Sequence, residues 1–458
     1  MPDRRPLKPR TKRLVDEDRR FLWHPFTQMA SWMEEEPPLV IEKGKGCWLV
    51  DSEGRRYLDG VSSLWCNVHG HRVKAIDRAV RKQLSRISHS TLLGLASPPS
   101  IALAKMLVEK APKGLARVFF SDNGATAVEA AVKMAFQFHA QTGSPRRTLF
   151  AALAEAYHGD TVGSISIGGM DLFHGLFTPL RFEVVRIPSP HCYRCPEGLD
   201  RSSCALACAA RARAVIEGHA QRLAAVVIEP LVQGAAGIIV HPEGYLGAVA
   251  DACRRHGVLL IADEVATGFG RTGTLFACEQ EGVVPDMLCL AKGLSGGYLP
   301  LGATMTTEAV FDAFLGAPAS RRAFAHGHTF TGNALACAAA IESLGLLVRR
   351  VMPTLRGTVD AFEGLLAGKI APLSHVGDVR SRGLMGGIEL VRDRRSREPY
   401  PPEERVGSRV TLEARRLGVI VRPLGDVIVL MPPLAITRKE LGLLVTAAAE
   451  AIRKVTGD

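Results

Sequence analysis

Two apolar stretches of the sequence end in side chains that can do acid–base or nucleophilic chemistry. Residues 258–262 (VLLIA) are followed by Asp263 and Glu264. Residues 287–291 (MLCLA) are followed by Lys292 and a glycine-rich segment. Apolar runs of this kind predict buried strands, and open α/β sheets bind ligands at the carboxyl ends of their strands. A buried carboxylate needs a cationic partner, and a lysine shielded from water can act as a nucleophile.

A turn at residues 121–126 (SDNGAT) leads into a helix predicted over residues 125–141. Backbone amides at such a turn bind phosphate readily, although the turn alone could be an ordinary helix cap. An enzyme that uses pyridoxal phosphate needs a lysine to hold the cofactor as a Schiff base, an acid to keep the pyridine nitrogen protonated, and donors for the phosphate. Lys292, Asp263 and this turn fit the three roles.

Short apolar runs alternate with helix-length patterns through much of the chain. This alternation predicts an α/β fold with a mostly parallel sheet flanked by helices. The predicted strands are residues 117–121, 148–152, 182–187, 224–228, 258–262 and 287–290, and the predicted helices are residues 125–141 and 242–256. After about residue 340 the pattern becomes that of a smaller α+β unit, with a helix at 338–351 and strand patterns at 379–390, 419–424 and 427–431.

Four parts of the chain are therefore expected. These are a basic flexible tail at 1–20, the N-terminal part of a small domain at 21–74, a large cofactor-binding domain at 75–340 with a cysteine-rich insertion at about 190–210, and a C-terminal small domain at 341–458. The hairpin pattern at 39–58 is expected to pack against the C-terminal unit. A length of 458 residues accommodates this organisation.

Composition excludes several classes of protein. Hydrophobic residues make up 47% and charged residues 22%, as in soluble globular proteins rather than disordered or fibrous ones. No apolar run approaches the roughly 18 residues of a membrane-spanning helix. Four units of the +11 charge lie in the first 20 residues, and no basic helix is interleaved with aromatic residues, so we expect no nucleic-acid partner. Ten cysteines without an export signal favour a reducing cytoplasm.

From Leu22 to about Ile452 the sequence resembles the class III, fold-type I aminotransferases, which use pyridoxal phosphate. The segments that carry this resemblance are WHPFTQM (23–29), GVSSLW (60–65), YHGDT (157–161), EPLVQG (229–234), ADEVATGFGRTG (262–273), HGHTF (326–330) and RPLG (422–425). The HPFTQM, SSLW and RPLG segments look most like the branch of biotin biosynthesis that converts 8-amino-7-oxononanoate to 7,8-diaminononanoate. The alternatives are a class III aminotransferase for ω-amino acids or diamines, and a metal- or redox-sensing binding protein that kept the fold.

The resemblance assigns cofactor-binding roles to single residues. Lys292 and Asp263 would be catalytic, with Lys292 moving the proton between the substrate carbon and the cofactor. Tyr157, a catalytic and cofactor-binding residue, would stack on the pyridine face. Gln233 would lie near the phenolic oxygen of the cofactor.

Phosphate binding is expected to involve two copies of the chain. By the resemblance, Gly124 and Ala125 give backbone donors, and Thr329 adds a hydroxyl from the partner subunit of a homodimer. The site is therefore expected at a subunit interface.

Substrate-binding residues also follow from the resemblance. Phe26, Trp65 and Arg271 would line the substrate channel, and Gly327 would contact the substrate. Arg422 would grip the carboxylate of the oxo acid, a task suited to a planar, bidentate guanidinium.

The amino donor stays open between S-adenosylmethionine, which the resemblance favours, and lysine. Where the best-known members of this branch carry Tyr, Trp and Pro, this chain has Phe26, Leu64 and His328. These departures remove a hydroxyl and an aromatic wall from the donor side of the pocket.

Four of the ten cysteines form a C-x2-C-x8-C-x3-C array at Cys192, Cys195, Cys204 and Cys208. Four thiolates can hold an iron–sulfur cluster or, alternatively, a tetrahedral zinc ion. We therefore predict a metal site separate from Lys292, with free or redox-paired thiols as the remaining alternative. The gap of eight residues is shorter than the roughly 15–20 of common zinc ribbons.

Overall fold

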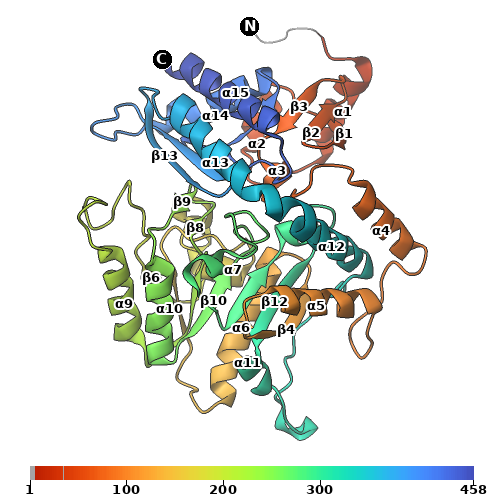
Figure 1. Ribbon diagram of the computed structural model, residues 1–458, viewed down its shortest axis with the longest axis vertical. Coiled ribbons are helices and arrows are strands. Elements are labelled where there is room, and N and C mark those ends of the chain that lie inside the picture. The colour runs from red at the N-terminus through yellow and green to blue at the C-terminus, as the bar shows by residue number, and fades with distance from the viewer. Residues whose placement is uncertain (1–5, 35) are drawn as a thin grey trace.

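A seven-stranded sheet forms the centre of the larger part of the molecule (Figure 1). The structure, a computed structural model, describes residues 6–34 and 36–458. The strand order is β4-β12-β11-β10-β7-β5-β6, and only β12 runs opposite to the others. The strands are β4 (Leu115–Ser121), β5 (Leu149–Leu153), β6 (Val184–Ile187), β7 (Leu223–Ile228), β10 (Leu259–Asp263), β11 (Met287–Leu290) and β12 (Gly302–Thr307). The mostly parallel α/β sheet is confirmed, and all six predicted strands are present.

Helices bury both faces of this sheet. Along β10, Leu259 and Ile261 belong to one apolar cluster, whereas Leu260 and Ala262 belong to another. Successive side chains of a strand point to opposite faces, so both faces are covered. The helices of this part are α4 (Lys74–Leu84), α5 (Pro98–Lys110), α6 (Gly124–Gln141), α7 (Val162–Ile167), α8 (Asp171–His174), α9 (Ala207–His219), α10 (Tyr245–His256), α11 (Glu308–Asp312) and α12 (Ala334–Leu346). Short elements complete it: η1 (Gly175–Leu180), η2 (Ala277–Glu281), η3 (Lys292–Ser295), η4 (Pro318–Ser320), β8 (Val232–Gln233) and β9 (Ile239–Val240).

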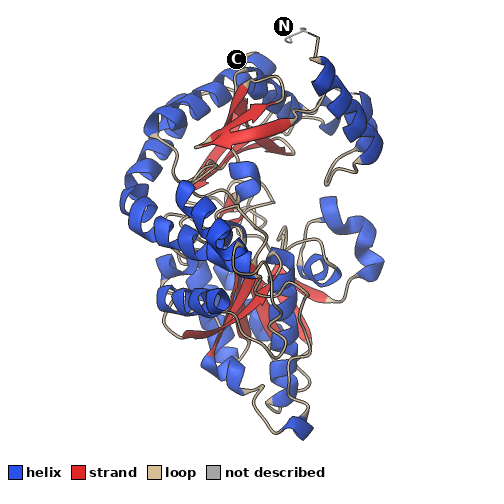
Figure 2. Cartoon of the chain, turned by 90° about the vertical axis from the view of Figure 1, so that its right-hand side faces the viewer, coloured by secondary structure: helices blue, strands red, loops and turns tan. Residues whose placement is uncertain are grey.

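The smaller part combines segments from both ends of the chain, as Figure 2 shows near the two termini. β3 pairs in parallel with β15, which confirms the expected packing of the N-terminal hairpin against the C-terminal unit. The strands are β1 (Ile41–Lys45), β2 (Trp48–Asp51), β3 (Arg56–Asp59), β13 (Val376–Arg382), β14 (Met385–Leu390), β15 (Val419–Ile420), β16 (Arg422–Leu424) and β17 (Val427–Leu430). The helical elements are α1 (Pro9–Phe21), α2 (Met29–Glu34), α3 (Ser62–Trp65), η5 (Leu347–Val351), α13 (Met352–Lys369), η6 (Pro402–Glu404), α14 (Val406–Arg416) and α15 (Arg438–Thr456).

The N-terminal tail is helical where the structure describes it. α1 covers Pro9–Phe21, so the prediction of a flexible tail is wrong for this stretch, while residues 1–5 lie outside the described residues. Val15 is buried, Thr11 donates a hydrogen bond to Ser52 Oγ at 2.9 Å, and Arg10 pairs with Glu42. Burial of one face against the N-terminal hairpin therefore orders a segment that looks solvated from its charge.

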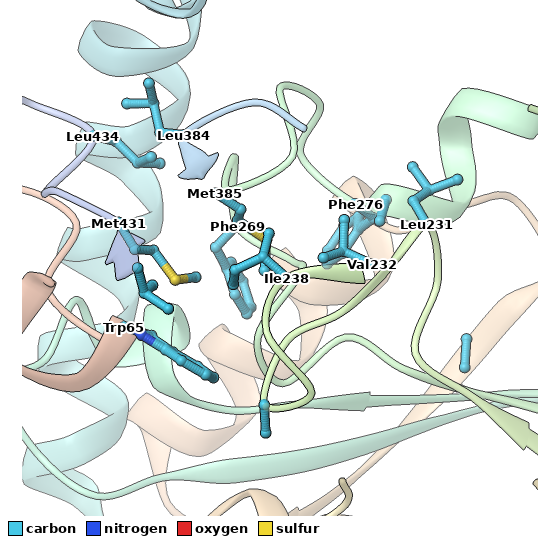
Figure 3. Packing of buried hydrophobic residues seen from close by; sticks show 14 of the residues in the cluster. Trp65, Leu231, Val232, Ile238, Phe269, Phe276, Leu384, Met385, Met431 and Leu434 are labelled. Atoms are coloured by element: carbon cyan, nitrogen blue, oxygen red, sulfur yellow. The ribbon is translucent and has the colours of Figure 1, made fainter. Parts of the chain in front are cut away.

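The two parts share one continuous hydrophobic core. Figure 3 shows Phe269 of the larger part close to Met385, Met431 and Leu434 of the smaller part, within the same buried cluster. The expected domain boundary after residue 340 falls inside α12, which continues through η5 into α13. Among residues 6–34 and 36–458, no helix is both long and apolar enough to cross a membrane.

Candidate active site

A cavity of about 710 Å³ opens at the carboxyl ends of β10 and β11. The predicted site residues that line it are Trp65, Gly124, Ala125, Tyr157, Asp263 and Lys292. Adjacent parallel strands end at the same edge of a sheet, which brings the acid and the lysine together from distant parts of the sequence. The structure thus brings these six predicted residues together around one cavity.

Asp263 is the last residue of β10 and is buried. Its Oδ2 lies 2.6 Å from Nδ1 of His158, and its Oδ1 accepts the backbone N–H of Val265 at 3.0 Å. Both carboxylate oxygens are therefore held in place, one by the buried His158 and the other by the backbone of Val265. Such a group can keep a pyridine nitrogen protonated.

Lys292 follows β11 and lies deep in the cavity. Burial lowers the pKa of its ammonium, while Asp263 and Glu229 partly oppose that shift. Its Nζ lies 5.1 Å from the centre of the Trp65 ring. The backbone of Lys292 has a φ of 43°, a left-handed conformation that costs free energy in a residue with a side chain and that clusters at functional sites. The structure thus holds a buried amine that loses its proton more easily than an exposed one.

The N-terminus of α6 forms a cradle at the edge of the cavity. Asn123 caps the helix in a reciprocal arrangement with Thr126, which leaves the amides of the first turn aimed outward. A Cβ on Gly124 would lie 2.6 Å from Cγ1 of Val265, and one on Gly159 would lie 2.4 Å from Cβ of Ala125. Glycine is required at both positions for this close packing. A helix N-terminus favours a phosphate group, so the cradle fits pyridoxal phosphate.

Tyr157 is held at the cavity wall from two directions. Its hydroxyl donates to Oδ2 of Asp160 at 2.7 Å, and its backbone N–H donates to Oε1 of Glu229 at 3.2 Å. Oε2 of Glu229 accepts the amide of Gly234 at 2.9 Å. Burial raises the pKa of Glu229 to about 7. Glu229 therefore joins the loop of Tyr157 to the loop that follows β7.

Arg422 begins β16 and is half-buried near Tyr157, with which it interacts electrostatically. Burial lowers the pKa of its guanidinium. Within the described part of the chain its guanidinium has no hydrogen bond or ion pair, so it is available to a carboxylate ligand.

Gln233 is not among the residues that line the cavity. It is fully buried outside the cavity lining, and its Oε1 accepts a hydrogen bond from Ser189 at 2.6 Å. Its Nε2 donates to the carbonyl of Ala154 at 2.8 Å. These two hydrogen bonds join two loops, and the predicted contact of Gln233 with the cofactor stays a prediction.

Arg271 is likewise buried and hydrogen-bonded to protein groups. It is 2% exposed, and its guanidinium donates to the carbonyl of Pro432 at 2.5 Å and to Ser62 Oγ at 3.3 Å. It lies outside the cavity lining. Its planar group instead ties the loop after β10 to segments of the smaller part.

We expect Arg271→Ala to act mainly on stability. Removing the guanidinium leaves buried acceptors such as the carbonyl of Pro432 unpaired, which should lower the free energy of unfolding by about 1–3 kcal/mol. Urea denaturation of the variant beside the wild type measures this change. An unchanged midpoint together with a large loss of substrate affinity would restore the substrate role.

Three further predicted residues, like Arg422, lie outside the lining of this cavity in the single chain. Phe26 is 54% exposed and packs edge-on against Phe173 at 5.4 Å, and Phe173 in turn contacts Tyr157. Gly327 and Thr329 are exposed on a loop whose Thr329 carbonyl lies 2.8 Å from Nε2 of His89. Their predicted contacts with cofactor and substrate stay predictions.

Several functional-looking residues were not predicted individually. The additional polar and apolar residues of the cavity include Cys66, His158, Asp160, Glu229 and Val265. Four of them lie in the YHGDT, EPLVQG and ADEVATGFGRTG segments. Their place in these segments was the sequence signal that could have identified them as site residues. Cys66 follows the GVSSLW segment directly.

The predicted metal site is not supported by the structure. Cys192, Cys195, Cys204 and Cys208 are unpaired and line one small cavity. Burial raises the pKa of Cys192 and raises that of Cys208 to about 11. In residues 6–34 and 36–458, no three His, Cys, Asp or Glu side chains are grouped so that they could hold an ion.

Comparisons with known proteins agree with this fold and site. The family model described as "Aminotransferase class-III" matches residues 29–452. The chain is 59% identical to the adenosylmethionine-8-amino-7-oxononanoate aminotransferase of Nitratidesulfovibrio vulgaris, over 98% of this chain and 83% of that one. It is 53% identical to the protein of the same name from Geobacter sulfurreducens, over 98% of this chain and 99% of that one.

Solved structures point the same way. The adenosylmethionine-8-amino-7-oxononanoate aminotransferase of Methanocaldococcus jannaschii superposes with a TM-score of 0.92 at 45% identity, covering 97% of this chain and 99% of that one. A PLP-bound amine transaminase from an uncultivated Pseudomonas species superposes with a TM-score of 0.89 at 38% identity, covering 95% and 98% of the two chains. The fold is thus that of the fold-type I transaminases. The chain belongs to the class III aminotransferases.

Proposed function

We propose that this chain is a pyridoxal phosphate-dependent aminotransferase that converts 8-amino-7-oxononanoate to 7,8-diaminononanoate in biotin biosynthesis. The observation that carries the enzyme class is the buried Lys292 beside Asp263 in a cavity bordered by the α6 cradle. The printed names of the relatives described above support the substrate.

Each of these residues has its own role in the proposed reaction. Bound pyridoxal phosphate supplies an aromatic ring that accepts an electron pair from the substrate carbon. Lys292 is placed to take the proton from that carbon and return it at the next atom, as general base and then acid. Asp263 would keep the pyridine nitrogen protonated, and the amides of Gly124 and Ala125 would bind the phosphate. Tyr157 would stack on the ring.

The amino donor is proposed to be S-adenosylmethionine, with lysine as the competing donor. A donor panel tests both the class and the substrate: 8-amino-7-oxononanoate is offered as acceptor with S-adenosylmethionine, lysine and simple ω-amines. Formation of 7,8-diaminononanoate with either amino acid supports the proposal. Transfer only between ω-amines and other oxo acids would assign the chain to another class III activity.

Replacement of Arg422 by Ala should weaken the oxo-acid half-reaction selectively. A bidentate, charge-assisted contact with a carboxylate is worth roughly 2–4 kcal/mol, so kcat/KM for 8-amino-7-oxononanoate should fall about thirty- to a thousandfold. Single-turnover experiments on each half-reaction measure this, and a donor lacking the contact should be affected much less. Equal damage to both half-reactions would make Arg422 a structural residue.

We also propose a homodimer with the active site at its interface. Leu93 and Phe330 expose 89% and 56% of their surfaces, and His89 lies between the two segments by contacting the ring of Phe330 and the carbonyl of Thr329. Neighbouring exposed apolar side chains mark an interaction surface, and a second copy could bring Thr329 to its cavity. Light scattering should give the mass of a dimer. A monomeric wild type with full activity would overturn this.

The proposed location is the cytoplasm, since all ten cysteines are free in the structure. The four cysteines between residues 192 and 208 have no part in the proposed reaction.

A further inference from the structure

One carboxyl group near the N-terminus holds two side chains that flank Phe26 in the sequence. Asp18 lies in α1 with its side chain largely buried, and its Oδ2 accepts the indole N–H of Trp32, in α2, at 2.9 Å. Nε2 of His24 lies 2.9 Å from Oδ1 of Asp18 and 3.1 Å from Oδ2. Carboxylate oxygens accept hydrogen bonds, so His24 is the donor whether or not its ring carries a charge. Asp18, His24 and Trp32 together form what we call the Asp18 clamp.

The clamp encloses a loop that has few other restraints. Residues 22–28 connect α1 to α2, and Leu22, Trp23 and Phe26 are all exposed, so apolar burial does little to order the loop. Phe26 has a φ of 52°, a left-handed conformation that costs free energy in a residue with a side chain. The conformation of the loop therefore depends on the side chains that Asp18 holds.

A row of aromatic rings connects this loop to the active-site cavity. Phe26 packs edge-on against Phe173 at 5.4 Å, and Phe173 contacts Tyr157 in the same way at 6.3 Å. Tyr157 lines the cavity that holds Lys292. Phe26 also lines a second cavity of about 750 Å³, between the N-terminal segment and α14, together with Trp32. The position of the loop therefore fixes where the Phe26 ring stands relative to Tyr157.

A transaminase admits its two substrates to the same cavity in turn. If the loop leaves its place for part of the time, each substrate binds only to the remaining fraction of the protein, and the apparent Kd rises by the inverse of that fraction. Proton transfer at Lys292 should not change, because neither Lys292 nor Asp263 contacts the clamp. The loss of the clamp is therefore expected in KM rather than in kcat.

We infer that Asp18 is a positioning residue for substrate binding: it clamps the loop of residues 22–28 so that Phe26 forms a wall of the substrate channel beside Tyr157. The inference rests on the proposed function, which supplies the role of this cavity. Asp18 does not line the cavity and acts through His24 and Trp32.

The first test compares Trp32→Phe with Trp48→Phe in the holoenzyme. Phenylalanine at position 32 keeps an aromatic ring against His24 but removes the N–H that Asp18 accepts, so KM for both substrates should rise about fivefold. The change in kcat should stay below about twofold. Trp48 is the matched control, because its indole donates to a carboxylate of Glu440 at 2.7 Å, away from the cavity. Equal KM values for the two variants, or a loss confined to kcat, would overturn the inference.

A double-mutant cycle identifies the route of the effect. Asp18→Ala removes both hydrogen bonds and should raise KM about tenfold or more. If the clamp acts through Phe26, adding Trp32→Phe to Phe26→Ala should raise KM by less than about twofold beyond Phe26→Ala alone. Losses that multiply independently would overturn the inference.

Hydrogen exchange gives a readout that needs no substrate. Backbone amides of residues 22–28 should exchange about fivefold faster in Trp32→Phe than in the wild type, whereas those of β10 and β11 should not change. Trp48→Phe should leave the exchange of the loop as it is. Unchanged exchange of the loop in Trp32→Phe would contradict the clamp. Failure of the wild type to form 7,8-diaminononanoate would instead contradict the proposed function, and KM would then be compared with the amine and oxo acid that do react.

Discussion

Replacement of Lys292 by Ala is expected to reduce turnover by about 10⁴-fold or more, because the variant loses both the covalent anchor and the proton-transfer group. The buried position beside the Trp65 ring offers no second amine for this role among the residues that line the cavity. The variant should also lack the visible absorption band of lysine-bound pyridoxal phosphate. Absorption spectra and single-turnover rates of the purified variant measure both losses.

Lys369→Ala is a suitable control for this experiment. Lys369 lies at the end of α13 in the smaller part, where its Nζ donates to Thr446 at 2.8 Å on the surface. Its replacement should leave the band and the rate unchanged. If Lys292→Ala kept full turnover, the assignment of the catalytic lysine would be wrong, whatever the spectrum showed.

The elements that carry Lys292 were predictable because they combine two simple signals. β10 and β11 are continuous apolar runs that end in charged residues, and such runs are typical of strands buried on both faces. β12 was not predicted, since its sequence GATMTT has no apolar run, although burial between β4 and β11 makes it a strand. Tertiary context overrides local preference there.

The place of a residue in a motif predicted the direction of its side chain less well than the apolar runs predicted the strands. Arg271 and Asp263 belong to the same segment, yet Asp263 faces the cavity and Arg271 faces the smaller part. Likewise, Glu229 lines the cavity, whereas Gln233 is hydrogen-bonded to Ser189 and does not line it. A motif indicates that a residue is constrained, whereas the identity of its hydrogen-bond partners depends on chain segments far away in the sequence.

The four cysteines show that the spacing of residues in the sequence does not by itself predict a metal site. Pairs of cysteines close in sequence came to one cavity, as the spacing implies. Metal binding additionally requires deprotonated sulfurs that converge on one point. Spacing does not report this convergence, and in residues 6–34 and 36–458 no three such side chains are grouped so that they could hold an ion.

Asp263→Asn is expected to slow both half-reactions by roughly 10²- to 10⁴-fold, the range of acid–base contributions in enzymes. Asparagine has nearly the same shape and can still accept the amide of Val265, so the fold should be retained. What it loses is the negative charge that keeps a proton on the pyridine nitrogen, and without that proton the ring is a poor acceptor of electrons. Since both half-reactions need this property, they should slow alike, in contrast to the selective loss expected for Arg422→Ala.

The neighbouring carboxylate provides the control for Asp263→Asn. Glu264 is fully buried, but its oxygens accept the backbone amides of Ala277 at 2.6 Å and Cys278 at 2.8 Å, and it does not line the cavity. Glu264→Gln should therefore lower the denaturation midpoint while the folded fraction keeps its rates. Single-turnover kinetics and urea denaturation on both variants separate the two effects. If Asp263→Asn lost stability but not rate, Asp263 would be a structural residue and the proton on the cofactor would need another source.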